Sequence, residues 1–175
     1  VQFNAMSGDV DFMRESATIN NISLYRENEE TAGITAYTTD IHVNAGDLNI
    51  NFNFGMNPDG TIKDDDQSRA WQEMVNDHRF LKALEISIDA EEIVDAVFNG
   101  LAEPNEYFAC TGDHEGAVAL LDEMGAVDVD GDGFRETPSG LPFYFNISVA
   151  TGGSMTDTLA CCELYREYWT ALGLN

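Results

Sequence analysis

The stretch DHRFLKALEISIDAEEIVDAVFNG, residues 77–100, contains two successive groups of apolar residues at helical spacing. The first group is Phe80, Leu81, Leu84 and Ile88, and the second is Ile93, Val94, Val97 and Phe98. Asp77 is a candidate N-cap of the first helix, while Asp89 and Gly100 bound the second. The stretch therefore predicts two short amphipathic helices joined near residue 89.

Helical periodicity extends on both sides of this stretch. Further helices are predicted over residues 14–28, from Asp66 through Trp71, Met74 and Val75, over residues 115–124 and over residues 155–172. Gly125 and Gly173 directly follow the last two segments, where glycine commonly ends a helix.

Three other segments have the pattern of strands. In DLNINFNF, residues 47–54, apolar residues alternate with asparagines, which is the period of a strand with one buried face. Residues 34–38 and 142–151 are also predicted to be strands. Because helices and strands alternate irregularly, the sequence predicts a mixed α/β (α+β) fold in which a mixed sheet packs against helices.

The composition restricts the classes of partner. The 175 residues, 43% of them hydrophobic, suffice for one domain or one large lobe. There are 32 acidic and 8 basic residues, which gives a net charge of −24 and argues against nucleic acid or an anionic membrane as a partner. Such acidity is typical of a well-solvated surface, and adaptation to high salt or attraction of cationic ligands are the alternatives.

The chain lacks an apolar run of the roughly 20 residues that a membrane span needs, and its first residues lack the pattern of a signal peptide. Both ends look cut, so we expect an excised piece of a longer protein. Its three cysteines, Cys110, Cys161 and Cys162, are expected to be free or buried thiols, because a bond between neighbouring cysteines on a helix would be strained.

The acidic segment VDVDGDGFRE, residues 127–136, has the start of a calcium loop. Asp128, Asp130 and Asp132 stand at positions 1, 3 and 5, and Phe134 could offer its carbonyl at position 7. Position 12 is Ser139 instead of glutamate, so the segment is not an EF-hand. Two interpretations stay open: a shorter calcium site completed by Glu136, or a turn whose carboxylates accept hydrogen bonds from local backbone N–H groups.

The sequence offers no recognisable catalytic set. His42, His78 and His114 stand alone, without an HExxH zinc motif, a GxSxG nucleophile or a phosphate-binding GxxxxGK[ST] loop. We therefore predict that the chain is not an enzyme, with an uncharacterised hydrolase kept as an alternative.

Four segments, taken in order, resemble the family 5 extracellular solute-binding proteins of ABC importers, which include dipeptide, oligopeptide and nickel binders. They are SGDVDFM (residues 7–13), INFNF (50–54), DHRFLKALEISIDAEEIVDAVFNGLAEP (77–104) and ALLDEMGAVDVDGDGFRETPSGLPFYFNI (119–147). The chain departs from the family pattern at Glu85 and Ile86, where Ser and Tyr are frequent, and at Ala90, where Arg is frequent.

The resemblance implies a partial C-terminal lobe of a type II periplasmic-binding-protein-like fold. Residues 1–13 would end the preceding lobe and form the crossover, and residues 14–175 would belong to the second lobe. The implied function is extracytoplasmic capture of a small solute such as an oligopeptide and its delivery to ABC permease subunits, by closure of two lobes on the ligand. The implied location is periplasmic or, as a lipoprotein, on the cell surface, with membrane association only through an N-terminal anchor outside this chain.

The resemblance also suggests where a solute would bind. Asn53 and Phe54, on the strand after the crossover, and Glu103, Pro104 and Asn105, after the third helix, are the expected ligand contacts. The alternative is that these residues do not contact a solute, in which case Asn53 would be a polar residue at a sheet edge and Phe54 would pack in the core. The family's acidic anchor for a peptide amino terminus would lie beyond Asn175, so this chain alone is expected to bind ligand weakly.

No cofactor is predicted apart from the candidate calcium ion. In the family the acidic turn after residue 127 is first of all architectural. A calcium-stabilised cell-surface interaction module is the alternative function that the acidic loop would serve.

Overall fold

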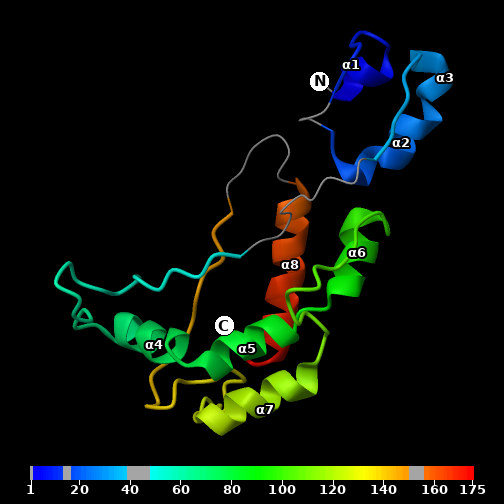
Figure 1. Ribbon diagram of the computed structural model, residues 1–175. Helices are drawn as coiled ribbons and strands as arrows, with labels where there is room; N and C mark the ends of the chain where they lie inside the picture. Colours follow the sequence, from blue (N-terminus) through cyan, green and yellow to red (C-terminus); the bar gives the residue numbers. More distant parts are fainter. Residues whose placement is uncertain (1, 14–16, 39–47, 150–155) are drawn as a thin grey trace. The chain divides into compact units, whose positions relative to one another are not determined.

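The computed structural model describes residues 2–13, 17–38, 48–149 and 156–175. In these ranges the regular elements are helical (Figure 1). They are α1 (Gln2–Met6), a 3-10 helix η1 (Ile19–Asn21), α2 (Ile22–Glu27), α3 (Glu29–Ala32), α4 (Asp66–Val75), α5 (His78–Ile86), α6 (Ala90–Phe98), α7 (His114–Met124) and α8 (Thr156–Ala171).

The chain divides into two compact units, each described here by itself. The first unit consists of Val1–Asp47, Glu92–Glu103 and Ser148–Cys162. The second unit consists of Leu48–Glu91, Pro104–Ile147 and Glu163–Asn175.

The first unit is held together by side-chain amides and one close backbone approach. The Asn21 Nδ2 atom donates to Gln2 Oε1 at 2.8 Å, which joins η1 to α1. Gly8 has a φ of 78°, and a Cβ atom at this position would lie only 3.0 Å from the carbonyl oxygen of Ala32. Glycine therefore permits the turn after α1 to approach the end of α3.

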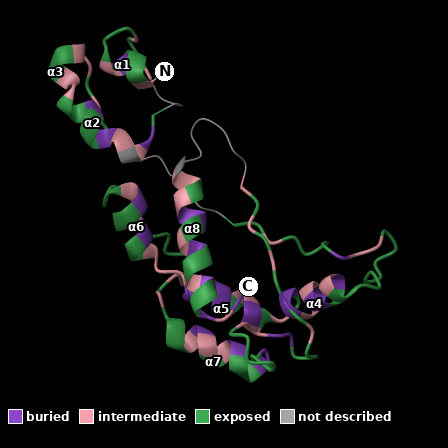
Figure 2. Cartoon of the chain, turned by 180° about the vertical axis from the view of Figure 1, so that it is seen from behind, coloured by how far each residue is buried: buried purple, intermediate pink, exposed green. Residues whose placement is uncertain are grey.

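The second unit has a dense apolar core. Helices α5 and α7 pack against each other, and Figure 2 shows the buried faces of α4 and α5 in purple. The largest fully buried apolar side chains of this unit are Phe80, Met74, Leu121, Leu172, Leu174 and Val75. Aromatic rings extend this core, because Phe143 contacts Phe80 edge-on with centroids 5.5 Å apart and stacks on Trp71 at 6.3 Å.

Aspartates cap three helices of the second unit, and one of these caps, Asp77, was predicted from the sequence. The carboxylates of Asp65, Asp77 and Asp113 accept hydrogen bonds from backbone N–H groups in the first turns of α4, α5 and α7. The predicted cap at Asp77 is thus confirmed, as is the end of α7 at Gly125, whose φ of 87° lies in the left-handed region.

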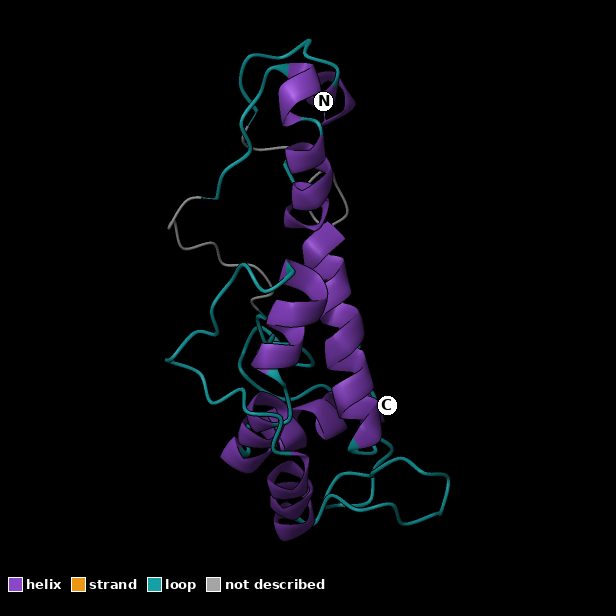
Figure 3. Cartoon of the chain, turned by 90° about the vertical axis from the view of Figure 1, so that its right-hand side faces the viewer, coloured by secondary structure: helices purple, strands orange, loops and turns teal. Residues whose placement is uncertain are grey.

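The predicted sheet is wrong for the part of the chain that the structure describes. Figure 3 shows helices and loops there, and the β pairing consists of three isolated bridges. They are Met56 with Ile62, Asp89 with Thr111, and Glu136 with Pro142. The predicted mixed α/β class, with a mixed sheet packed against helices, is therefore replaced by a helical architecture, while residues 47, 150 and 151 of the predicted strands lie outside the described residues.

The reason for this error differs between the segments. Residues 51–56 fold into successive turns, in which the Phe54 N–H bonds to the Asn51 carbonyl at 3.2 Å and the Met56 N–H to the Asn53 carbonyl at 3.1 Å. Residues 143–145 keep the alternation, since Phe143 is buried and Tyr144 exposed, but they pair with no strand among the described residues. Periodicity indicates which face is buried, whereas a strand also requires a neighbouring backbone.

A charge at the start of α5 makes the stability of the second unit depend on pH. Hydrogen bonds from the Arg79 side chain lower the pKa of Asp77 from 3.8 to about 2. Because the folded-state pKa is depressed, the ionised carboxylate stabilises the fold above pH 3.8, and this contribution is lost as the pH falls toward 2.

We expect Asp77→Asn to lower the free energy of unfolding by on the order of 2 kcal/mol above about pH 5, because asparagine keeps the cap and loses the ion pair. Urea unfolding of the unmodified chain and of Asp77→Asn at a series of pH values measures the difference between their free energies of unfolding. This difference should become smaller below pH 3.8. A difference in free energy of unfolding that stays constant from neutral pH down to pH 3 would contradict the lowered pKa of Asp77 in the folded state.

Candidate functional site

The turn that carries Asn53 is held against α4 by two side chains. The Gln72 side chain is buried, and its Nε2 atom donates to the carbonyl oxygens of Phe52 at 2.9 Å and Phe54 at 2.6 Å. The Trp71 Nε1 atom donates to the Asn51 carbonyl at 2.9 Å. The backbone of this turn is therefore fixed, while Asn53 itself is exposed.

Phe54 packs against Trp71 on one side and is exposed to solvent on the other. Its ring meets the Trp71 ring edge-on with centroids 6.0 Å apart, yet 41% of the residue is exposed. An aromatic ring that is supported from one side and accessible from the other can contact an apolar group of a ligand.

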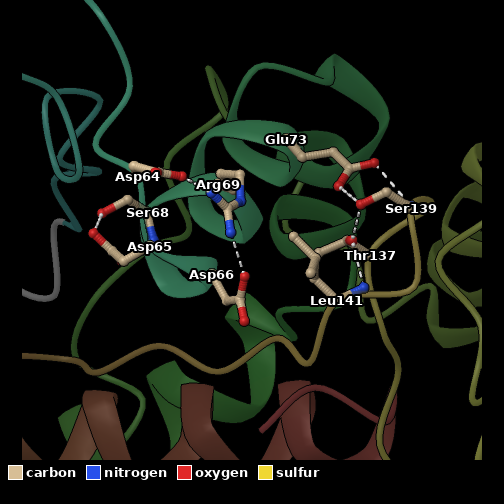
Figure 4. Close-up of polar contacts among 9 residues, drawn as sticks. All are labelled: Asp64, Asp65, Asp66, Ser68, Arg69, Glu73, Thr137, Ser139 and Leu141. Atoms are coloured by element: carbon tan, nitrogen blue, oxygen red, sulfur yellow. Dashed lines mark hydrogen bonds and ion pairs between the residues drawn. The ribbon is translucent and has the colours of Figure 1, made fainter.

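Gly55 permits this turn to lie directly on the first turn of α4. Its φ is 77°, and an added Cβ atom would lie 2.7 Å from the Cβ of Ser68. Ser68 is itself fixed, because its N–H and Oγ both donate to the carboxylate of Asp65 at 2.8 Å (Figure 4). These hydrogen bonds lower the pKa of Asp65.

The second predicted contact segment is exposed. Glu103, Pro104 and Asn105 all face solvent, with Glu103 in the first unit and the other two in the second. Asn105 shapes the following turn, because its Oδ1 atom accepts from the Tyr107 N–H at 3.0 Å and its carbonyl from the Phe108 N–H at 3.2 Å. The turn displays Tyr107, which is 86% exposed, and Phe108, which is 58% exposed.

Glu85 anchors the end of this exposed segment to α5. Its Oε1 atom accepts from the Ala109 N–H at 2.8 Å, and its Oε2 atom accepts from Lys82 Nζ at 2.9 Å. The Ala109 hydrogen bond and then the Lys82 side chain lower the pKa of Glu85. Glu85 is one of the positions where the sequence departs from the family pattern, and here the departure has a structural role.

The structure thus brings Asn53 together with Phe54 and Pro104 with Asn105. No hydrogen bond or ring contact joins these two pairs in the described ranges. Sequence reasoning missed Gln72 and Glu85 as the residues that hold the two segments. A glutamine between Trp71 and Met74 on the apolar face of α4 was the one available signal for the first.

The acidic loop gathers three of its predicted calcium ligands. One carboxylate oxygen from each of Asp128, Asp130 and Asp132 lies within 4.8 Å of the others, and all three residues are exposed. Each carboxylate also accepts a local backbone hydrogen bond: Asp128 from Gly131 and Gly133, Asp130 from Asp132, and Asp132 from Phe134.

The other predicted ligands are placed differently. Glu136 is buried and lies outside the group of three carboxylates, with its Oε2 atom accepting from the Val129 N–H at 2.7 Å. The Phe134 N–H donates to Asp132 Oδ1 at 2.8 Å. Oxygen atoms are the ligands that calcium prefers, so the three aspartates fit such an ion in kind, whereas Glu136 serves the turn.

Arg135 joins the acidic loop to two helices. Its guanidinium donates to the Leu172 carbonyl at 2.7 Å, to Asp122 Oδ1 at 2.6 Å and to the Ala126 carbonyl at 2.6 Å. The side chain is only 13% exposed. Beside it lies an open hollow of about 300 Å³ bordered by Asp122, Asp128 and Gly173.

A second link joins α4 to the turn that follows the loop. The Ser139 N–H and Oγ donate to the two carboxylate oxygens of Glu73 at 2.9 and 2.6 Å, and Thr137 Oγ1 lies 3.0 Å from Ser139 Oγ (Figure 4). Ser139, at position 12 of the calcium spacing, therefore faces Glu73. The group contains no histidine, so it lacks the base of a serine hydrolase.

The described histidines and the cysteines form no catalytic group with one another. His78 and His114 are exposed, and His42 lies outside the described residues. Cys110, Cys161 and Cys162 are not in disulfide bonds, as predicted. Burial raises the pKa of Cys161 to about 11 and also raises the pKa of Cys110, which keeps both thiols protonated at neutral pH.

Comparison with known proteins gives one family. Residues 2–175 match the family model described as bacterial extracellular solute-binding proteins, family 5, middle. No curated protein matches the chain.

Several solved structures are similar to this chain, and two are described here. An oligopeptide-binding protein, OppA, has a TM-score of 0.65 and 26% identity over 98% of this chain and 28% of its own chain. A periplasmic oligopeptide-binding protein of an ABC transporter from Thermotoga maritima, solved with mannohexaose bound, has a TM-score of 0.48 and 28% identity over 55% of this chain. The match spans only 21% of the Thermotoga chain.

Proposed function

Since this chain belongs to the bacterial extracellular solute-binding proteins, family 5, we propose that the whole protein captures an oligopeptide for an ABC importer. The resemblance read from the sequence is confirmed by the match over residues 2–175. The prediction that the chain is not an enzyme is confirmed as well, because the family is one of solute-binding proteins.

The proposal also names a substrate class, a mechanism of delivery and a location, which the family match alone does not give. The named substrate class of OppA and its 26% identity support an oligopeptide as the solute. We infer delivery to permease subunits by closure of two lobes, with residues 1–13 at the crossover and residues 14–175 in the second lobe. The protein would work outside the cytoplasm, in the periplasm or as a surface lipoprotein. In the described part of the chain no helix is long and apolar enough to span a membrane.

The observation that carries the proposal is the fixed turn with an exposed amide and an exposed ring. The Asn53 amide can both donate to and accept from the peptide groups of a ligand, because it offers an oxygen and an NH₂ group. Phe54, supported by Trp71, offers an apolar surface beside it. Tyr107, with 86% exposure in the other segment, offers a second aromatic surface.

The experiment is a solute screen by thermal shift on the whole protein that contains this chain, followed by affinity measurements on variants. A solute that binds the folded state raises the melting temperature. We expect oligopeptides to do so. We also expect Tyr107→Ala to weaken the affinity about tenfold, the loss that corresponds to removing an aromatic contact worth about 1.4 kcal/mol.

Tyr144→Ala is the matched control, because Tyr144 is a 49% exposed tyrosine of the same unit outside both candidate segments. Its affinity should stay within about twofold of the unmodified protein. Stabilisation by other solutes but not by any oligopeptide would reject the substrate class. Equal affinities for both variants would reject the contact at residue 107.

Calcium binding by the acidic loop stays a prediction with one supporting observation, the approach of three aspartate carboxylates within 4.8 Å. A calcium-stabilised interaction module is the second candidate function that this observation favours. The two interpretations differ in what calcium does at constant ionic strength, and the salt experiment below includes that comparison.

A further inference from the structure

The chain has too few cations to neutralise its own surface. Its 8 basic residues face 32 acidic ones, so 24 negative charges stay in excess whatever the arrangement of the side chains. Among the residues that the structure describes, the Lys and Arg side chains in ion pairs are Arg69, Arg79, Lys82, Arg135 and Arg166. The excess charge can therefore be stabilised only by water, dissolved ions and hydrogen bonds from uncharged groups such as backbone N–H.

Part of this charge is locally dense. The three loop aspartates place carboxylate oxygens within 4.8 Å of one another, and no ion pair with a basic side chain involves them in the described residues. At the start of α4, Asp64, Asp65 and Asp66 are consecutive, and Arg69 pairs with Asp64 and Asp66. Such neighbours in sequence stay close in any conformation, but acidic residues that are distant in sequence can move apart when the chain unfolds, so their mutual repulsion in the compact state opposes folding.

The strength of this repulsion depends on ionic strength. Charges interact over about 30 Å at 0.01 M salt, but over only about 3 Å at 1 M. At low salt each excess charge therefore interacts with many others across a compact unit, whereas at high salt only near neighbours interact. Salt also weakens the attraction within ion pairs, but the chain has only 8 basic residues, so less attraction is lost than repulsion is relieved among the 24 excess negative charges.

We propose that the folded state of this chain depends on high ionic strength, so that the acidic surface acts as a salt-dependent conformational device. The chain folds fully in concentrated salt and loosens or unfolds when salt is removed. This inference is independent of the solute that the whole protein binds. Of the explanations for the acidic composition, the inference favours adaptation to high salt over an ordinary well-solvated surface.

The test is a series of thermal unfolding curves of the chain in KCl from about 0.05 M to about 2 M. We expect the melting temperature to rise by about 10 °C or more across this range. A control series in sucrose separates screening from the general exclusion of solutes from protein surfaces, which also stabilises compact states. A further control adds millimolar CaCl₂ at constant ionic strength.

A charge variant tests the cause. Glu27, Glu106 and Glu167 are exposed acidic residues outside the ion pairs described above. The triple variant E27K/E106K/E167K should melt at a higher temperature at low salt and show a shallower rise with KCl. The matched variant E27D/E106D/E167D keeps the charge and should follow the unmodified chain.

Four results would overturn the proposal. One is a melting temperature that does not change with KCl, another is a rise that sucrose reproduces in full, and the third is a rise that the lysine variant leaves unaltered. The fourth is stabilisation that appears with millimolar calcium alone, which would assign the effect to an ion site in the acidic loop.

Discussion

Replacing Arg135 with alanine is expected to lower the free energy of unfolding of the second unit by about 3 kcal/mol. The guanidinium is 13% exposed and donates to two backbone carbonyls and to Asp122. Its removal leaves those acceptors without a donor and separates the acidic loop from the ends of α7 and α8. Because small domains are stable by only about 5–15 kcal/mol, this is a large fraction of the total.

Urea unfolding in concentrated KCl measures this loss. Arg166→Ala is the matched control, since Arg166 is 69% exposed and pairs with Glu163 on the surface at 2.9 Å. Its effect should stay within about 0.5 kcal/mol. Arg135→Lys should fall between the two, because an ammonium group cannot reach three divergent acceptors as a planar guanidinium does. Equal decreases in the free energy of unfolding for Arg135→Ala and Arg166→Ala would show that the hydrogen bonds of Arg135 do not stabilise the second unit.

The second large effect is expected at Gly55. Alanine there must adopt a φ of 77° and place its Cβ atom 2.7 Å from the Cβ of Ser68. The left-handed conformation costs about 1 kcal/mol, and the overlap forces the turn away from α4 at an additional cost of about 1–3 kcal/mol. Because the same turn carries Asn53 and Phe54, Gly55→Ala should also weaken solute binding by the whole protein.

Gly60→Ala separates the two causes. Gly60 has a φ of 84°, but an added Cβ atom would meet nothing within 4 Å. It should therefore show the conformational cost alone, with solute affinity unchanged. The measurements are urea unfolding and solute titration of both variants. If Gly55→Ala proves no more harmful than Gly60→Ala, the close packing of this turn on Ser68 is incorrect.

The helices of the second unit were predictable because their signals are local. Apolar spacing and a capping aspartate at residue 77 lie within a few residues of each other, so α5 can be read without knowing its neighbours. The strands were not predictable in this way. Phe143 and Tyr144 alternate as a strand would, but the alternation says nothing about whether another backbone lies alongside.

The candidate site shows the same division. The three close aspartates could be found from spacing alone, because their positions all fall within one turn-rich segment. The roles of Gln72 and Glu85 could not, since their partners lie 18 to 24 residues away in sequence. A polar side chain that binds a distant backbone leaves no periodic signal.

The scarcity of lysine has a consequence for how this chain can be attached to a sensor surface. Only Lys63 and Lys82 carry side-chain amines. The backbone N–H of Lys63 bonds to the Gly55 carbonyl at 2.8 Å, and Lys82 bonds to Glu85, which holds Ala109. Coupling through either lysine would therefore tether the chain beside the segments expected to touch solute, and immobilisation through an appended tag would leave them accessible.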